Sequence, residues 1–160
     1  MFPTHDHALG LTAMYPNAKF LYIIRNGCDV VQSHRKFPNF QHMDFQQACK
    51  RWADGVYKYE YITELGNGLE VRQEDLRDDP ETFFKDVLAF LEFEHDDAPC
   101  EFAQSTLIHP LDQPTHSDIN VKQVLADRPP SHRDWSEQEK DTFGDICGEA
   151  MIKQGYELPF

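Results

Sequence analysis

The chain has 160 residues, 40% of them hydrophobic and 27% charged, so it is long and apolar enough to form one folded domain, which we expect to span residues 1–160. A formal net charge of −13 without a basic patch excludes nonspecific binding to nucleic acid. The sequence has no run of about 18 apolar residues and no signal-peptide pattern, so it predicts neither a membrane span nor a secretory leader.

The first predicted unit is a strand, a tight turn and a helix. Residues 19–24 form a continuous apolar and aromatic run, which is typical of a central strand with both faces covered by helices. Asn26 and Gly27 mark a turn after this strand. Asp29 then opens a stretch that we expect to be helical to about His34.

Helices and strands alternate in the middle of the chain. Between residues 45 and 62 apolar side chains recur every three to four positions, which predicts a helix that ends at the turn of residues 66–68. Residues 69–73 predict a second strand, and Pro80 begins a helix that extends to Leu91. This order predicts an α/β fold in which helices cross over between parallel strands.

The end of the chain combines an irregular segment with a well-marked helix. Residues 95–131 contain five prolines and no sustained hydrophobic period, so we expect a long irregular connection with at most a short helix, of the kind that is usually functional. Residues 136–139 form a capping box, which predicts a final helix that stops at Gly155.

The cysteines and the acidic residues narrow the choice of ligand. The four cysteines are widely spaced and form no CxxC pair, which argues against a zinc site and a disulfide framework, so we expect no metal and a reducing, cytoplasmic location. Twelve acidic and three basic residues lie between Glu70 and Glu101, and this stretch accounts for −9 of the net charge. Because the rest of the chain is only mildly acidic, a local anion site there is compatible with the overall charge.

Arg25 and Ser33 form a candidate phosphate site. Arg25 follows the first strand, at the carboxyl edge where α/β sheets bind ligands, and it precedes the N-terminus of a helix. The Ser33 hydroxyl can donate to the same anion that the Arg25 guanidinium binds. The spacing alone leaves an alternative open, in which Arg25 is a surface salt-bridge partner and Ser33 is solvated.

The stretch YPNAKFLYIIRNGCDVVQSH, from Tyr15 to His34, closely resembles a sulfotransferase motif with an aromatic-Pro pair, Ala-Lys, an apolar strand, Arg and Asp-Val-Val-x-Ser. In that family the Arg and the Ser bind the 3′-phosphate of 3′-phosphoadenosine 5′-phosphosulfate. The resemblance therefore implies a P-loop-like sulfotransferase fold with a central parallel sheet flanked by helices. It also implies that Arg25 and Ser33 hold this nucleotide donor.

Two further segments resemble the same family. Residues 71–81 resemble its strand and its YEDL…DP turn, with Gln73 in place of the usual Tyr. The sequence SHRDW at residues 131–135 resembles its C-terminal region, where a basic residue near a Trp reaches the same phosphate. Arg133 is therefore a third candidate, with a solvated loop charge as its alternative.

The resemblance covers only the latter part of the family's length, so we expect a fold that is truncated at its N-terminus. The family's Ser/Gly/Thr-rich loop with a lysine does not occur in the sequence. The amides of that loop would hold the 5′-phosphosulfate, so without them we expect transfer of the sulfuryl group to be severely impaired. Residues 1–5, MFPTH, resemble the family's Lys-x-Pro-x-His segment. His5 is therefore a candidate general base, with an exposed bystander near the chain end as the alternative.

The resemblance implies a sulfotransferase whose partners are the nucleotide donor and an acceptor. The sulfuryl group would pass to a hydroxyl or amine of the acceptor by direct displacement, without a metal, and this chain would supply the 3′-phosphate-binding part. An alternative from another class is a noncatalytic nucleotide-binding or interaction module derived from the same fold. A nucleotide kinase fits less well, because kinases need the phosphate loop that the sequence lacks.

Overall fold

The computed structural model describes residues 5–36, 42–64, 67–108 and 130–160. The chain divides into two compact units, which we call unit 1 (residues 1–70 and 131–160) and unit 2 (residues 71–130). The expectation of a single domain over residues 1–160 stays a prediction.

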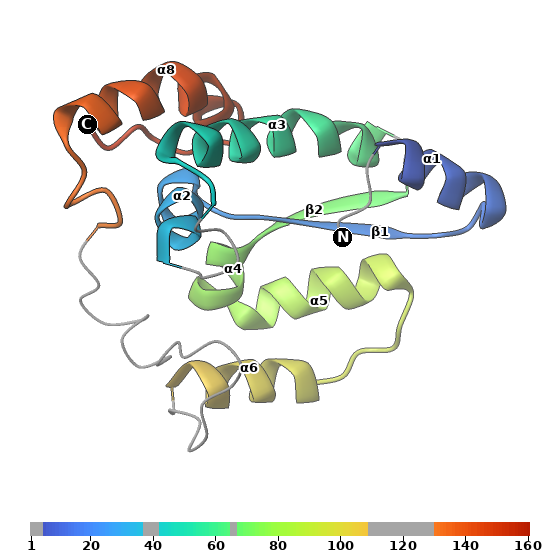
Figure 1. Ribbon diagram of the computed structural model, residues 1–160. Helices are drawn as coiled ribbons and strands as arrows, with labels where there is room; N and C mark the ends of the chain where they lie inside the picture. Colours follow the sequence, from blue (N-terminus) through green and yellow to red (C-terminus); the bar gives the residue numbers. More distant parts are fainter. Residues whose placement is uncertain (1–4, 37–41, 65–66, 109–129) are drawn as a thin grey trace. The chain divides into compact units, whose positions relative to one another are not determined.

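A two-stranded parallel sheet begins the architecture. Strands β1 (Phe20–Ile24) and β2 (Gly68–Arg72) are hydrogen-bonded neighbours and run in the same direction (Figure 1). Helix α2 (Gly27–Lys36) follows β1 after two residues, and helix α3 (Phe45–Glu64) leads from there to β2. This strand-helix-strand crossover confirms the predicted α/β class with parallel strands and helices.

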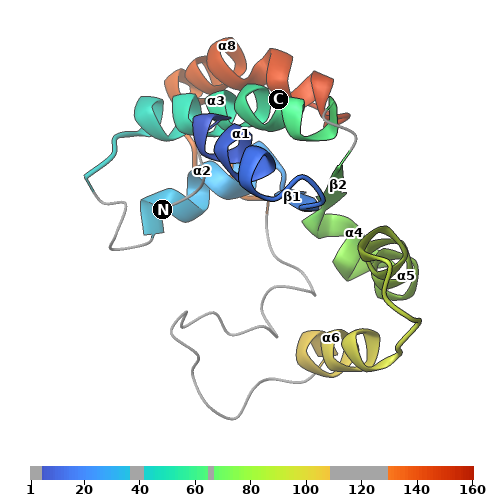
Figure 2. The same cartoon turned by 90° about the vertical axis from the view of Figure 1, so that its right-hand side faces the viewer.

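Two more helices pack against α3 in unit 1. Helix α8 (Glu137–Lys153) lies along α3 in both views (Figures 1 and 2), and α1 (His5–Met14) contacts α3 near its other end. The sequence did not indicate α1, since its apolar residues do not keep to one helical face and Gly10 lowers helix propensity. No helix in the described part of the chain has both the length and the apolar character needed to cross a membrane.

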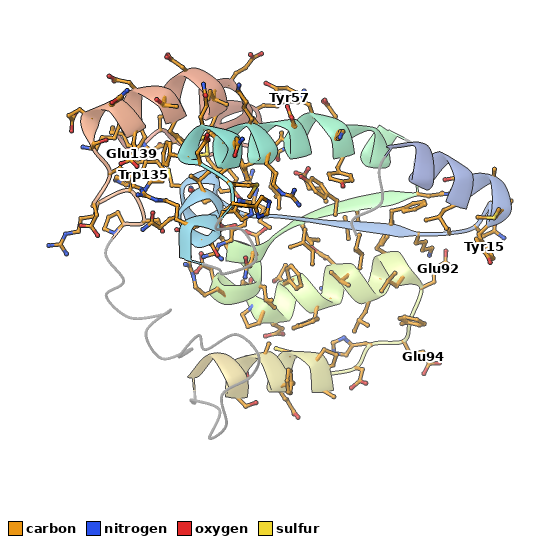
Figure 3. All side chains as sticks on the ribbon, in the orientation of Figure 1. Tyr15, Tyr57, Glu92, Glu94, Trp135 and Glu139 are labelled. Carbon is orange, nitrogen blue, oxygen red and sulfur yellow. The ribbon has the colours of Figure 1, made fainter. Side chains whose placement is uncertain are left out.

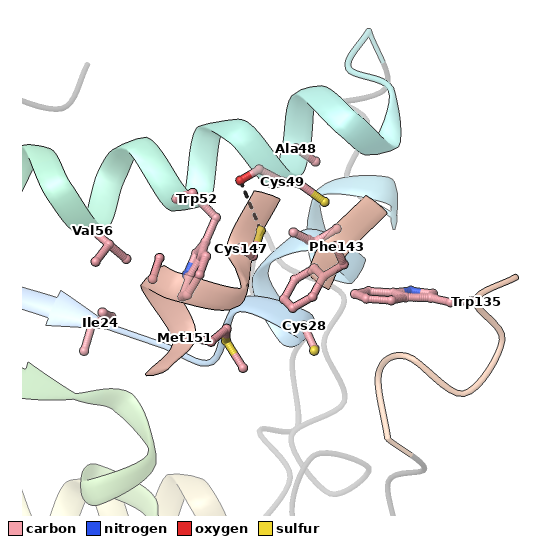
Figure 4. Close-up of a cluster of buried hydrophobic side chains, with 13 residues drawn as sticks. Ile24, Cys28, Ala48, Cys49, Trp52, Val56, Trp135, Phe143, Cys147 and Met151 are labelled. Carbon is pink, nitrogen blue, oxygen red and sulfur yellow. Dashed lines mark hydrogen bonds between the residues drawn. The ribbon is translucent and has the colours of Figure 1, made fainter. Parts of the chain in front are cut away.

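The core of unit 1 is formed by α2, α3, α8 and the end of β1 (Figure 4). Phe143, Cys147 and Met151 of α8 are fully buried, and they share this core with Trp52 and Val56 of α3. The buried residues follow the helical period of three to four on both helices, so two apolar stripes face each other. This packing joins the C-terminal segment to the segment that follows β1.

Strand β1 has one covered and one exposed face. Tyr22 and Ile24 belong to the packed side, where the Tyr22 ring lies 5.1 Å from the ring of Tyr59 on α3, centroid to centroid. Leu21 and Ile23, on the opposite face, are 40% and 63% exposed. Within unit 1, α3 covers one side of this strand, because successive side chains alternate across a strand, and coverage of the second face by helices stays a prediction.

The described residues of unit 2 comprise the end of β2 and three helices. Helix α4 (Gln73–Asp78) begins directly after β2, so Gln73 is helical and does not belong to the second strand as predicted. The predicted helix at Pro80 is confirmed as α5 (Pro80–Leu91), whose N-terminus is capped by Asp79 accepting from the Thr82 backbone at 3.1 Å. Helix α6 (Ala98–Ile108) packs against α5 and is the short helix allowed in the irregular connection. Residues 109–129 of that connection lie outside the described residues.

Both predicted ends of α8 are confirmed. Ser136 Oγ accepts from the Glu139 backbone at 3.2 Å, and the Glu139 carboxylate accepts from the Ser136 backbone at 2.8 Å, which completes the capping box. Gly155 has a φ of 70°, and the next backbone N–H, that of Tyr156, donates to Met151 at 2.9 Å. This is a Schellman ending, which requires a left-handed residue at the position of Gly155.

Candidate functional site

Hydrogen bonds and packing fix the turn between β1 and α2. Asn26 Oδ1 accepts from the Cys28 backbone N–H at 2.9 Å, so Asn26 caps α2. Gly27 is the first residue of α2, and a Cβ at that position would lie 3.0 Å from ring atoms of Trp52. Trp52 Nε1 donates to the backbone carbonyl of Arg25 at 3.1 Å. A side chain from α3 therefore holds the backbone from which the Arg25 side chain extends.

The side chain of Arg25 is paired with Asp29. Arg25 Nη2 and Nε donate to Asp29 Oδ2 at 3.0 and 3.3 Å. The pair is half-buried, with 28% of the Arg25 side chain and 33% of the Asp29 side chain exposed. Within the described residues no hydrogen bond or ion pair involves the remaining nitrogen, Nη1. Arg25 can therefore bind an anion through the Nη1 edge of its guanidinium without releasing Asp29.

Asp29 also connects the site to the C-terminal segment. The Ser131 hydroxyl donates to Oδ1 of Asp29, across a separation of 102 residues in the sequence. Trp135, which is 4% exposed, donates from Nε1 to Gln32 Oε1 on α2 at 3.0 Å. These two bonds attach residues 131–135 to α2.

The predicted site residues are distributed as follows. Ser33 is half-buried on α2, four residues after Asp29, so the two lie on the same helical face. Arg133 is exposed in the turn of residues 131–134. Arg25, Ser33 and Arg133 all belong to unit 1, on segments that Asp29 joins. His5 begins α1, and because its side chain lies outside the described residues, its role stays a prediction.

Aromatic and charged contacts hold the start of α8 against α2 and α3. Arg35 of α2 pairs with Glu139 at 3.1 Å, and its guanidinium lies 5.7 Å from the centre of the Phe45 ring. The Phe45 ring meets the Trp135 ring edge to face at 4.9 Å. Figure 3 shows Trp135 and Glu139 at the same end of unit 1, where α8 begins. The turn beside the candidate site therefore rests on a packed support.

Cys28 and His34 of α2 are neutral at pH 7. Burial, with a smaller contribution from the Asp29 charge, raises the pKa of the Cys28 thiol to about 12, so this thiol is a poor nucleophile. Burial, followed by the nearby charge of Arg51, lowers the pKa of His34. The positive charge of the Tyr15 to His34 segment at this site therefore comes from arginine and not from imidazolium.

Among the residues that the structure describes, no three His, Cys, Asp or Glu side chains gather so that they could hold a metal ion. All four cysteines are free thiols. The expectation of a metal-free site stays a prediction.

The ion pair of Arg25 with Asp29 agrees with the alternative in which Arg25 is a salt-bridge partner, and the i, i+4 spacing of the two residues is a signal for it in the sequence. Two other contacts of the site were not anticipated. The bond from Ser131 to Asp29 and the bond from Trp52 to the Arg25 carbonyl have no signal in the sequence, because both join segments far apart along the chain.

The model of the sulfotransferase family matches residues 2–97 of this chain. The chain belongs to the sulfotransferase family. Among solved structures, the mouse sulfotransferase SULT7A1 complexed with PAP is similar, with a TM-score of 0.61 and 22% sequence identity over 91% of this chain and 62% of the mouse chain. No curated protein sequence matches the chain. The structural likeness confirms the P-loop-like α/β fold of sulfotransferases that the sequence motif implied.

The sulfotransferase match includes most of the candidate site. Residues 2–97 contain Arg25, Asp29 and Ser33, while Ser131 and Arg133 lie beyond the matched segment. This sulfotransferase chain corresponds to 62% of the length of the mouse chain that it resembles.

Proposed function

We propose that this sulfotransferase chain binds the 3′-phosphate of 3′-phosphoadenosine 5′-phosphosulfate, the donor of the sulfuryl group. Arg25 and Ser33 are the main contacts, and Arg133 is a third. The observation that carries the proposal is the Arg25 guanidinium at the carboxyl end of β1, which Asp29 holds along one edge and whose side chain is 28% exposed. The fold that the chain shares with a PAP-bound mouse sulfotransferase supports this choice of ligand.

The proposed contacts act by positioning the donor. The planar fork of an arginine matches phosphate oxygens, and charge-assisted hydrogen bonds of this kind are among the strongest in proteins. The 3′-phosphate is distant from the bond that breaks, so binding energy gained there holds the nucleotide in place for the reaction. In the transfer, the bond between sulfur and the bridging phosphate oxygen breaks as sulfur bonds to the acceptor oxygen or nitrogen. The acceptor's proton passes to a base, for which His5 is the candidate.

The test uses adenosine 3′,5′-bisphosphate (PAP), which carries the 3′-phosphate but no sulfuryl group. Calorimetric titration should show that Arg25→Ala weakens PAP binding by at least about tenfold, since one charge-assisted hydrogen bond contributes roughly 1.5–3 kcal/mol. Adenosine 5′-monophosphate, which lacks the 3′-phosphate, should bind the unsubstituted chain and Arg25→Ala with equal affinity.

A matched control is Arg77→Ala, which removes an arginine that also pairs with an aspartate, Asp78, but on α4 in unit 2. This variant should bind PAP like the unsubstituted chain. Equal PAP affinities of Arg25→Ala and the unsubstituted chain would contradict the proposal, and displacement of PAP by ATP at equal concentration would favour a kinase-like site.

A second candidate is a noncatalytic nucleotide-binding module, because Arg25, Ser33 and Arg133 would hold the donor without taking part in the transfer. Both candidates predict PAP binding that depends on Arg25. They differ in turnover, because only the enzyme transfers radiolabelled sulfuryl from the donor to an acceptor mixture once the N-terminal half of a sulfotransferase is supplied. Binding without transfer under those conditions would favour the module.

A further inference from the structure

We infer that Asp29 is the positioning residue of this anion site and that Ser131 controls it. The inference rests on the proposed function above. Asp29 holds Arg25 in the orientation that presents Nη1 to the 3′-phosphate, and the Ser131 hydroxyl holds Asp29. The turn of residues 131–134 therefore affects the orientation of Arg25 in the donor site, although it is distant from Arg25 in the sequence.

The geometry gives Asp29 a fixed orientation. Its Oδ2 accepts both hydrogen bonds from Arg25, and its Oδ1 accepts the hydrogen bond from Ser131. A carboxylate rotates easily about its last side-chain torsion, because this torsion has broad and shallow minima. The bond from Ser131 selects one rotation, and that rotation keeps Oδ2 directed at Nε and Nη2 of Arg25.

The carboxylate of Asp29 has two opposing effects on phosphate binding. Its negative charge repels the phosphate, but Arg25 already offsets this charge, and solvent screens a pair whose side chains are 28% and 33% exposed. The second effect is favourable: Asp29 orders Arg25, a long side chain that would otherwise lose its rotamer freedom when the phosphate binds. We expect the ordering to be the larger effect, so removal of Asp29 should weaken binding.

The first experiment needs no nucleotide. The side-chain Nε–H of Arg25 gives an NMR signal that Arg25→Lys removes, which assigns it. Its heteronuclear NOE should be that of a rigid group in the unsubstituted chain, and it should fall to that of a mobile side chain in Asp29→Asn and in Ser131→Ala. An unchanged NOE in both variants would overturn the inference.

The second experiment measures PAP affinity by calorimetry. Asp29→Ala should weaken binding about tenfold and Ser131→Ala about threefold, as expected for the loss of a hydrogen bond to a charged and to a neutral group. Ser131→Thr keeps the hydroxyl and should retain affinity within about twofold. In the Arg25→Ala background, none of these substitutions should weaken binding further, because they act through Arg25. Asp29→Ala should there tighten binding, since Arg25 no longer offsets the charge of Asp29.

Two controls remove similar groups elsewhere. Asp78→Asn changes an aspartate that accepts from Arg77 Nε at 2.6 Å, and Ser105→Ala removes a hydroxyl that donates to the Phe102 carbonyl at 2.8 Å. Neither should alter the Arg25 signal or PAP affinity.

Tighter binding by Asp29→Ala as a single substitution, or losses that persist in the Arg25→Ala background, would overturn the inference. Failure of the unsubstituted chain to bind PAP would instead contradict the proposed function, while the NMR signal would still decide whether Asp29 and Ser131 order Arg25.

Discussion

Gly27 stands at a position where a single methyl group would disturb the candidate site. A Cβ on Gly27 would lie 3.0 Å from three atoms of the Trp52 ring, which is closer than a normal contact. The same ring is stacked near Phe143 and donates its N–H to the Arg25 carbonyl. A larger side chain at Gly27 would therefore disturb both the core of unit 1 and the backbone of Arg25, the proposed phosphate ligand.

Gly27→Ala should lower the free energy of unfolding by about 1–3 kcal/mol, the usual cost of overpacking a dense core. Urea unfolding followed by circular dichroism measures this change. The matched control is Gly55→Ala within α3, where nothing lies within 4 Å of the new Cβ. This control should gain roughly 0.5–1 kcal/mol from the better helix propensity of alanine. A Gly27→Ala variant as stable as Gly55→Ala would contradict the prediction.

At the scale of the element, α5 and α8 end in the same way with different residues. Helix α8 uses Gly155 at the left-handed position, whereas α5 uses Glu92, with a φ of 60°. Phe93 after Glu92 donates to the Leu88 carbonyl at 3.0 Å, so the ending of α5 is also of the Schellman type. A left-handed conformation costs a residue with a Cβ about 1–2 kcal/mol, and glycine avoids this cost.

Glu92→Gly should therefore stabilise α5, by roughly 0.5–1 kcal/mol after the greater flexibility of glycine in the unfolded chain is counted. Glu94→Gly removes the same charge two residues later, at a position without a positive φ, and should give no gain (Figure 3). Circular dichroism during urea unfolding compares the two. A gain of the same size in both variants would show that charge, and not backbone conformation, is responsible.

Local signals in the sequence predicted most elements correctly. The apolar run before Arg25 predicted β1, and the capping box at Ser136 predicted the start of α8. Both signals depend only on neighbouring residues. The sequence did not predict α1, whose apolar residues lack a clear stripe and which contacts α3. The start of α4 at Gln73 was also missed, because β2 runs directly into this short polar helix. No turn residue marks the boundary between the two elements.

At the scale of the molecule, the charge is unevenly distributed along the chain. The stretch from Glu70 to Glu101 carries −9 of the net charge of −13 and includes α4, α5 and the beginning of α6. Like charges held together in a folded state repel one another, and salt screens this repulsion. Unit 2 should therefore be more sensitive to ionic strength than unit 1.

Raising sodium chloride from about 10 to 150 mM shortens the screening length from about 30 to 8 Å. The midpoint of thermal unfolding should then rise by roughly 2–4 °C, as expected for about 1 kcal/mol in a chain of this size. The double variant Glu94→Gln, Glu101→Gln, which neutralises two exposed acids, should be more stable at low salt and respond less. A midpoint that falls with added salt would show that attractive ion pairs dominate instead.

The candidate site was only partly predictable from the sequence. Arg25 and Ser33 were identified because a motif of adjacent residues carries them, and the family match contains both. The contributions of Trp52 and Ser131 depend on contacts across 27 and 102 residues, which only the folded chain brings together. Periodicity and spacing describe neighbours along the chain and carry no information about such distant contacts.

The positions of the two tryptophans allow their fluorescence to report on the folding of unit 1. Trp52 and Trp135 both belong to unit 1, and residues 71–130 contain no tryptophan. Indole emission therefore follows unit 1 alone, whereas circular dichroism follows the helices of both units. Coincident melting curves from the two signals would mean that the chain unfolds as one cooperative body, and separated curves would mean that unit 2 melts independently.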